Sequence, residues 1–283
     1  EVASHFCGLS RPRWRAGETG IHPLYLEPGN PTMTARCLTI AHKGYSARYP
    51  ESTRICYESA ISAGADIVEL DVRTTRDGAL VIKHERTLAD LTELTGNVDD
   101  YTLAELQAVD FGVRFDVRYA GQRILSLDEL LDLVEPHPVG LCIELKDVEE
   151  RDRPGCGDDV VARLKARNLL HRAVINVRLS ETSRRLLALE PRLRLALDAP
   201  LPRWSTTSDF WMLAADLAVS GAHIVEYDYQ YLTAEIVRAF QRIGYPVWAW
   251  TVNRRDDMLR LLDWGDDGIL TDDPALLRAV AER

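Results

Sequence analysis

The sequence predicts an α/β protein that folds as a somewhat irregular (β/α)8 TIM barrel with an N-terminal extension. Its 283 residues suit one barrel domain. Short apolar strands alternate with amphipathic helices, which is typical of a parallel sheet covered by helices. The strands are continuous apolar runs, so both of their faces should be buried. Residues 1–36 lack this pattern, and we expect an extension at 1–36 and a barrel domain at 37–283.

Nine segments read as strands, one more than an eightfold barrel needs. They span residues 38–42, 66–72, 79–84, 140–145, 173–177, 192–197, 222–227, 246–252 and 267–271. The turn dipeptide Asp77-Gly78 joins the second and third segments and leaves no room for a crossover helix. We therefore expect one segment to be an extra strand at an edge or at the rim. The long connection 84–123 should lie on the active-site face.

Several helices carry recognisable start and stop signals. The segments 52–63, 233–243 and 255–264 each end just before a glycine. Capping boxes begin at Thr102 and Ser126, each with a glutamate three residues later. These signals place the helices between the strands, as a barrel requires.

Composition excludes some classes of protein. The net charge of −10 argues against a nucleic-acid partner but allows a small anionic substrate in a locally basic pocket. No apolar run is long enough to predict a membrane span. The five cysteines form no CxxC motif, and no signal peptide precedes the first strand, so a cytoplasmic protein with reduced thiols is expected. The oligomeric state is left open.

Polar residues follow the apolar parts of four successive strands. They are His42-Lys43, Glu69 with Asp71, Lys83-His84-Glu85, and Glu144 with Lys146. Residues two apart on a strand point to the same face, here toward the barrel interior or mouth. Taken singly, each is most simply a solvated rim residue, an ion-pair partner or a hydrogen-bonded histidine. Taken together, three acids, two histidines and two lysines at one set of strand ends favour a functional site.

Three carboxylates buried together repel one another unless a cation lies among them. Glu69, Asp71 and Glu144 offer hard oxygen ligands, which suit Mg²⁺ or Ca²⁺, with Mn²⁺ as an alternative. Zinc is disfavoured because neither Cys nor His completes the set. The residues therefore predict one divalent cation.

Several motifs, in order, resemble those of the glycerophosphodiester phosphodiesterase family. They are IAHKGYSARYPEST (40–53), GADIVELDVRTTRDGALVIKHERTL (64–88), LCIELKD (141–147) and VWAWTVNRRDDMLRLLDWGDDGILTDDPALL (247–277). The resemblance covers about residues 37 to 280. It implies a TIM barrel that uses a divalent cation to hydrolyse a small-molecule phosphodiester, in lipid metabolism.

The resemblance also implies roles for single residues. His42 and His84 would be the acid/base pair, and Glu69, Asp71 and Glu144 would hold the metal. Lys43 and Lys146 would contact the phosphate. Trp250 would form an apolar wall near the alcohol of the substrate, although a place in the barrel core explains it nearly as well. Glu51 would lie in the layer behind the metal ligands.

Three positions depart from the family pattern. Lys43 stands where the family has Arg, Ser52 where it has Asn, and Glu85 where it has Asp after the second histidine. A lysine lacks the bidentate fork of an arginine at a phosphate site. These departures suggest a non-standard substrate, such as a sugar phosphodiester of the agrocinopine type.

Two alternatives stay open at this point. A lyase-type reaction, as in related phospholipases D, would form a cyclic phosphate instead of hydrolysing the diester. A catalytically silent barrel would only bind a phosphorylated ligand or a protein partner. The altered Lys43 and Glu85 favour the silent barrel, and the intact histidines and acids argue against it.

Overall fold

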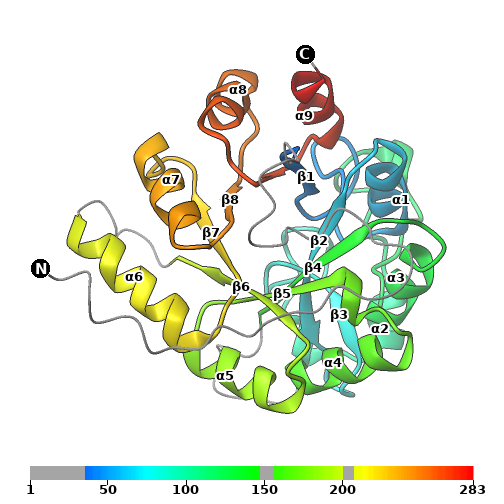
Figure 1. The fold of residues 1–283 in the computed structure, drawn as a ribbon. Coiled ribbons are helices and arrows are strands. Elements are labelled where there is room, and N and C mark those ends of the chain that lie inside the picture. Colours follow the sequence, from blue (N-terminus) through cyan, green and yellow to red (C-terminus); the bar gives the residue numbers. More distant parts are fainter. Residues whose placement is uncertain (1–35, 147–155, 200–206, 283) are drawn as a thin grey trace, which may run out of the picture.

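The computed structural model describes residues 36–146, 156–199 and 207–282, and in this part of the chain eight parallel strands close into a barrel (Figure 1). The strands are β1 (Leu38–Ala41), β2 (Ile67–Thr74), β4 (Gly140–Leu145), β5 (Ala173–Val177), β6 (Arg194–Asp198), β7 (Ile224–Asp228), β8 (Val247–Trp250) and β9 (Gly268–Thr271). The sheet closes because β1 pairs with both β2 and β9. The predicted TIM barrel is confirmed. The predicted N-terminal extension lies outside the described residues, apart from Arg36.

The ninth strand, β3 (Leu80–Ile82), is the extra one. It pairs antiparallel with the end of β2, with Val72 opposite Ile82 and Thr74 opposite Leu80. The Asp77-Gly78 turn joins the two, and Gly78 has a φ of +83°, a conformation that glycine adopts without strain. The expectation of one extra strand, joined to its predecessor by the Asp77-Gly78 turn without a crossover helix, is confirmed, and Lys83-His84-Glu85 follow this strand. These residues reach the mouth because β3 folds back along the part of β2 that extends beyond the barrel.

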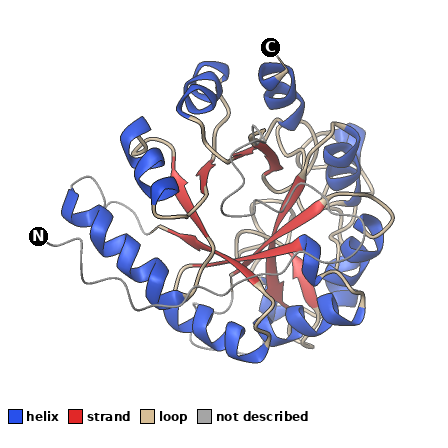
Figure 2. Ribbon diagram, viewed as in Figure 1, coloured by secondary structure: helices blue, strands red, loops and turns tan. Residues whose placement is uncertain are grey.

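Helices surround the strands (Figure 2). They are α1 (Arg54–Ser62), α2 (Leu103–Gln107), α3 (Leu127–Val134), α4 (Cys156–Ala166), α5 (Ser180–Leu189), α6 (Thr207–Ser220), α7 (Ala234–Arg242), α8 (Arg255–Trp264) and α9 (Pro274–Ala281), with short 3₁₀ turns at Val98–Asp100, Val117–Tyr119 and Leu170–Arg172. Both predicted capping boxes form, since Thr102 and Ser126 accept from the backbone N–H groups of Glu105 and Glu129. Gly265 ends α8 in the left-handed conformation, as predicted.

Alternation along the strands divides the buried residues into two layers. The barrel interior holds Leu38, Ile40, Ile67, Cys142, Val174, Ala196, Ile224, Trp248 and Leu270. The residues between them, such as Val68, Leu70 and Ile143, face the helices in the larger core. Continuing the inward positions by two residues leads directly to the polar side chains at the mouth.

The floor of the barrel, at the strand starts, carries its own acids. Asp66, just before β2, accepts hydrogen bonds from the backbone N–H of Thr39 at 2.8 Å, from Arg36 at 2.5 Å and from Arg278 at 3.1 Å. Asp267, just before β9, accepts from the backbone N–H of Val247 at 2.8 Å. Such carboxylates cap the strand starts by satisfying backbone and guanidinium donors.

The connection between β3 and α3 forms a small unit with its own apolar core. That core contains Val81, Leu88, Val98, Leu106, Phe111 and Ile124, all nearly inaccessible to solvent. The unit lies on the mouth side, as predicted for a long βα connection. His84 lies where β3 enters it, so this unit helps to position one of the predicted catalytic groups.

Candidate active site

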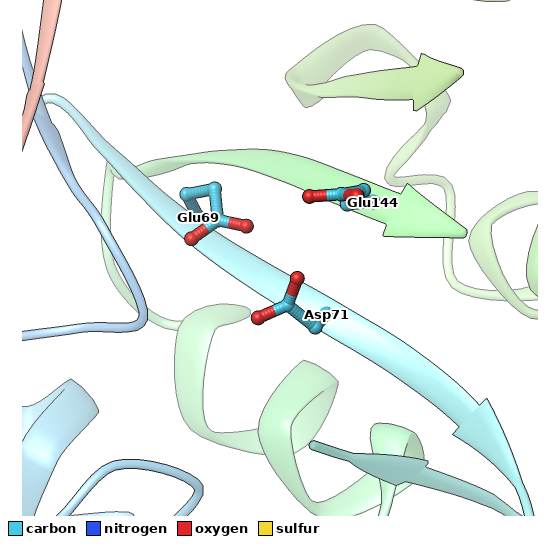
Figure 3. A group of neighbouring side chains, drawn as sticks. All are labelled: Glu69, Asp71 and Glu144. Atoms are coloured by element: carbon cyan, nitrogen blue, oxygen red, sulfur yellow. The ribbon is translucent and has the colours of Figure 1, made fainter. Parts of the chain in front are cut away.

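Glu69, Asp71 and Glu144 come together at the barrel mouth. Figure 3 shows their side chains pointing toward one another from β2 and the neighbouring β4. One carboxylate oxygen of each residue lies within 4.8 Å of the corresponding oxygens of the other two. Every second side chain of a strand points to the same face. Glu69 and Asp71 therefore point inward like Ile67, and Glu144 points inward like Cys142.

Burial and the neighbouring charges act differently on the carboxyls of Glu69 and Asp71. Burial, followed by the negative charges of Asp71 and Glu144, raises the pKa of Glu69 well above its ordinary value. Burial also opposes the ionisation of Asp71, but the charge of Lys146, followed by those of His84, His42 and Lys43, leaves the pKa of Asp71 below its ordinary value. Two carboxyls two residues apart therefore have pKa values displaced in opposite directions.

Lys146 lies beside two of the three acids. Its Nζ donates to Glu144 Oε1 at 2.6 Å and lies 3.1 Å from Asp71 Oδ1. The second contact is an ion pair without hydrogen-bond geometry, so Asp71 Oδ1 has no hydrogen-bond partner among the described residues. Burial disfavours the ammonium, but the charges of Asp71 and then Glu144 outweigh this and raise the pKa of Lys146. Lys146 is therefore a fixed positive charge at the mouth.

His42 is held by a carboxylate from the opposite end of the chain. Its Nδ1 lies 2.7 Å from Asp272 Oδ1, which also accepts from the hydroxyl of Ser46 at 3.0 Å. Asn253 donates to the other oxygen of Asp272 at 2.5 Å. Burial opposes the ionisation of Asp272, but its bond to His42 lowers the pKa of Asp272 overall. The ionised Asp272 thus holds the His42 ring through its Nδ1.

His84 has a different environment. Its Nδ1 lies 2.8 Å from Glu85 Oε1, and its side chain is 31% exposed. Burial is the largest influence on this ring and lowers its pKa, opposed by Asp71 and assisted by Lys146 and Lys43. His84 is therefore neutral near pH 7 and able to accept a proton.

Lys43 links Glu51 to the acidic cluster. Its backbone N–H donates to Glu69 Oε2 at 2.7 Å, and its Nζ donates to Glu51 Oε2 at 3.2 Å. Lys43 has a φ of +54°, which is uncommon for a residue with a side chain and aims its N–H at Glu69. Ser52 has a φ of +66°, in the region where asparagine is favoured over serine. Glu51 thus contacts the ammonium of Lys43 and not the carboxylates of Glu69, Asp71 and Glu144.

Trp250 is the last residue of β8, which lies across the barrel from β2 and β4. Its indole Nε1 donates to Asp198 Oδ1 at 3.0 Å, and its ring packs on the inner layer of the barrel while staying partly exposed. Arg178 Nε donates to Asp198 Oδ2 at 3.0 Å, and Arg178 Nη2 lies 3.6 Å from Glu144 Oε1. Burial is the main reason that the pKa of Asp198 rises to about 6.

The residues fit a divalent cation. The three carboxylates supply hard oxygen atoms at short mutual distance, and Asp71 Oδ1 is a buried acceptor to which no described residue donates a hydrogen bond. A doubly positive ion among them would relieve the repulsion that raises the pKa of Glu69. All three come from rigid barrel strands, which favours a preformed site.

The sequence analysis missed Asp272, Asp198 and Arg178. Asp272 and Asp198 are two residues beyond the inward-facing Leu270 and Ala196, and Arg178 is four beyond Val174. The parity that identified Glu69 and Glu144 would have identified these three as well. Their partners could not be found in this way, because His42 and Asp272 are 230 residues apart in sequence.

Known proteins match the chain along most of its length. The model of the glycerophosphoryl diester phosphodiesterase family matches residues 42–276. A glycerophosphodiester phosphodiesterase of Caldanaerobacter subterraneus subsp. tengcongensis is 32% identical over 242 residues, which cover 86% of this chain and 96% of that protein. Another, from Bacillus subtilis, is 31% identical over 89% of each chain.

Solved structures agree with the fold. A putative glycerophosphoryl diester phosphodiesterase from Silicibacter pomeroyi has a TM-score of 0.78 and 25% identity, over 88% of this chain and 94% of its own. A phosphodiesterase from Oleispira antarctica, solved with its product sn-glycerol-3-phosphate, has a TM-score of 0.77 at 24% identity, over 86% of this chain and 96% of its own. The barrel, its acidic mouth and these matches define a phosphoric diester hydrolase. The chain belongs to the glycerophosphoryl diester phosphodiesterase family.

Two further expectations can be compared with the structure. The described residues contain no helix that is long and apolar enough to cross a membrane. Cys37, Cys56, Cys142 and Cys156 are free thiols. Cys7 lies outside the described residues.

Proposed function

We propose that this chain is a metal-dependent phosphodiesterase that hydrolyses a glycerophosphodiester-like or sugar phosphodiester to an alcohol and a phosphomonoester. The observation that carries the proposal is the group of three carboxylate oxygens within 4.8 Å of one another, with His42 and His84 among the charges that act on Asp71. The names of the related proteins support glycerophosphodiesters as the substrate class.

Glu69, Asp71 and Glu144 would hold the cation, with Mg²⁺ or Ca²⁺ preferred and Mn²⁺ as an alternative. When bound, such an ion polarises the phosphoryl oxygens and stabilises the charge that grows on them in the transition state. Lys146 and Lys43 would contact the phosphate, and Glu51 would orient the ammonium of Lys43 through their 3.2 Å hydrogen bond. In this proposal the three carboxylates serve only as metal ligands, and the imidazoles of His42 and His84 carry out the proton transfers.

The two histidines would divide the proton transfers. The pKa of His84 is lowered by burial, so the neutral ring accepts the proton of the attacking water. His42 then donates a proton from Nε2 to the departing alkoxide. The 2.7 Å contact with Asp272 keeps the ring oriented and stabilises its positive charge while it carries that proton.

Trp250 would border the alcohol of the substrate, together with Arg178 and Asp198. The departures from the family pattern at Lys43, Ser52 and Glu85 motivate a sugar phosphodiester, including the agrocinopine type, as a substrate to test beside glycerophosphocholine. Replacement of Lys43 by Arg provides the specificity test. If Lys43→Arg shifts turnover toward glycerol-type diesters, Lys43 selects the substrate, and unchanged preferences contradict that role.

The deciding experiment is turnover of glycerophosphocholine and of sugar phosphodiesters by protein stripped with EDTA and then supplied with Mg²⁺, Ca²⁺ or Mn²⁺. We expect activity only with metal, and ³¹P NMR should show a phosphomonoester. A persistent cyclic phosphodiester signal would replace hydrolysis by the lyase-type reaction. Inactivity on every substrate with every metal would favour the silent barrel.

The cytoplasmic location and the absence of a nucleic-acid partner remain predictions, which cell fractionation and a gel-shift assay can test.

A further inference from the structure

A rigid loop beside the mouth exposes apolar side chains to solvent. Residues 110–122 belong to the connection between β3 and α3, and three alternate positions in the loop are hydrophobic. Val113 is 45% exposed, Phe115 is 46% exposed and Val117 is 76% exposed. We call these three side chains the apolar patch. Exposed apolar side chains that cluster on one loop commonly mark an interaction surface.

The loop is built to present this patch. Asp110 accepts from the backbone N–H groups of Gly112 at 2.8 Å, Val113 at 3.0 Å and Gly121 at 2.6 Å, which ties the two ends of the loop together. A Cβ at Gly112 would lie 1.9 Å from the carbonyl oxygen of Tyr119, so only glycine allows this close crossing. The exposure of the apolar patch therefore comes from a fixed backbone.

Arginines are interleaved with the apolar patch. Arg114 is 46% exposed and Arg118 is 74% exposed, and Arg123, at the end of the loop, is also exposed. Residues 110–123 contain these three arginines and two acids, Asp110 and Asp116, which gives a net charge of +1, whereas the whole chain has a net charge of −10. The loop and Arg123 are thus weakly basic on an acidic protein. Its ion pairs, to Asp116 and Glu93, are exposed and exchange readily for other anions.

The loop adjoins the active-site segment 42–50. The hydroxyl of Tyr119 donates to the carbonyl oxygen of Arg48 at 3.0 Å, and the rings of Tyr119 and Tyr49 lie 5.6 Å apart. Arg48 is 67% exposed and extends the basic character of the loop toward the mouth. A surface that contacted the apolar patch would therefore lie close to the entrance of the site.

We propose that the 110–122 loop docks this protein onto an anionic phospholipid surface. Val113, Phe115 and Val117 enter the interfacial region, and Arg114, Arg118 and Arg48 contact the headgroups. This combination of apolar side chains and arginines matches peripheral membrane-binding surfaces, whose affinity grows with both buried apolar area and charge attraction. The proposal goes beyond the proposed catalytic activity and does not depend on it.

A second exposed apolar surface provides a matched control. Trp211 is 59% exposed, Met212 is 56% exposed and Val219 is 55% exposed on α6. These residues are comparable in size and exposure, but both charged residues in the sequence of this helix, Asp209 and Asp216, are acids. An anionic surface should therefore not attract the α6 face.

The experiment is co-sedimentation of the full chain with phosphatidylcholine vesicles, with and without phosphatidylglycerol. We expect binding to the anionic vesicles that weakens as salt is raised. The double variant Phe115→Ser/Val117→Ser should reduce the partition coefficient by about tenfold or more. Arg118→Gln should reduce it by about fivefold. Trp211→Ser/Met212→Ser should bind as the wild type does, and thermal unfolding of each variant confirms that it is folded.

Three outcomes would overturn the proposal. Wild-type protein could stay in the supernatant with anionic vesicles at low salt, the loop variant could sediment unchanged, or the α6 variant could lose as much binding as the loop variant. Vesicle binding is measured without turnover, so its failure is distinct from a failure of the phosphodiesterase assay. A dimer that Val117→Ser dissociates, together with no vesicle binding, would instead identify the patch as a contact between copies.

Discussion

The mouth and the floor of this barrel use the same residue types in opposite ways. At the floor, Asp66 accepts from one backbone N–H and two arginines, so its charge is fully compensated. At the mouth, Glu69, Asp71 and Glu144 face one another instead, and Asp71 Oδ1 lacks a hydrogen-bond donor among the described residues. The difference indicates that burial of an acid is not by itself a sign of function. A group of acids indicates a ligand site when several carboxylate oxygens converge and at least one of them has no hydrogen-bond donor among the described residues.

The largest effect is expected at the mouth. Glu69→Gln removes one charged ligand and should lower kcat/KM by about a thousandfold, since an ion contributes several kcal/mol to the transition state. The same variant should lose most of the rise in melting temperature that added Mg²⁺, Ca²⁺ or Mn²⁺ gives the wild type. Calorimetric metal titration checks the cause. Unchanged metal affinity would remove Glu69 from the ligand set.

The histidines offer a second contrast between the two ends. His42→Ala and His84→Ala should each lower kcat by about a hundredfold to ten-thousandfold with little change in melting temperature. His223, at the floor, accepts a backbone hydrogen bond from Leu195 at 3.2 Å, and burial lowers its pKa to about 4. His223→Gln should therefore leave kcat unchanged. Equal losses in all three variants would show that the assay reports folding rather than proton transfer.

The floor should respond in stability instead of activity. Asp66→Ala removes the acceptor of the Thr39 N–H and the ion-pair partner of Arg278, and should lower the free energy of unfolding by about 2–3 kcal/mol. Chemical denaturation measures this loss, and metal affinity and kcat of the folded fraction should stay at wild-type values. A drop in metal affinity would show that the two ends are coupled.

Asp266 also lies at the floor, but it differs from Asp66 in having no compensating donor among the described residues. The change in the free energy of unfolding expected from its substitution near pH 5 is the smallest of those predicted. Neither of its oxygens has a hydrogen-bond partner among the described residues, and burial, with the charge of Asp267, raises its pKa from 3.8 to about 8. Below pH ~4 the carboxyl is protonated in both the folded and the unfolded chain. Between about pH 4 and 8 only the folded chain keeps the proton, so the free energy of unfolding falls as pH rises, by up to about 1.4 kcal/mol per pH unit.

Asp266→Asn stays neutral and should lose this pH dependence. The variant should equal the wild type near pH 4 and exceed its free energy of unfolding by roughly a few kcal/mol at pH 8. Urea unfolding at a series of pH values provides the measurement. Parallel curves for the two proteins would show that Asp266 has a compensating partner.

Local sequence signals were enough for much of this molecule. The apolar runs gave the strands, Gly265 gave the end of α8, and strand parity gave the convergence of Glu69, Asp71 and Glu144. Parity works here because side chains of buried strands alternate strictly between two faces. These features depend on neighbours within a few residues along the chain.

Other features required the closed barrel. Asp272 reaches His42 only because β9 pairs with β1, a contact between opposite ends of the domain. The Asp77-Gly78 turn indicated that no crossover helix joins β2 and β3, but which residues of the two strands lie opposite one another was known only from the structure. The ion pair between Arg178 and Asp198 forms because β5 and β6 are neighbours in the barrel. The sequence alone does not show which side chains of neighbouring strands come into contact.

The antiparallel pairing of β3 places the polar groups of the mouth on two structural units. The carboxylates of Glu69, Asp71 and Glu144 and the ring of His42 belong to the closed barrel, whereas His84 is carried by a ribbon that continues into residues 85–123. Insertions or replacements in that segment can reshape the substrate pocket while every strand of the barrel keeps its two neighbours. Residues 85–123 can therefore vary, by natural substitution or by engineering, while the group of three carboxylates on the barrel strands stays the same.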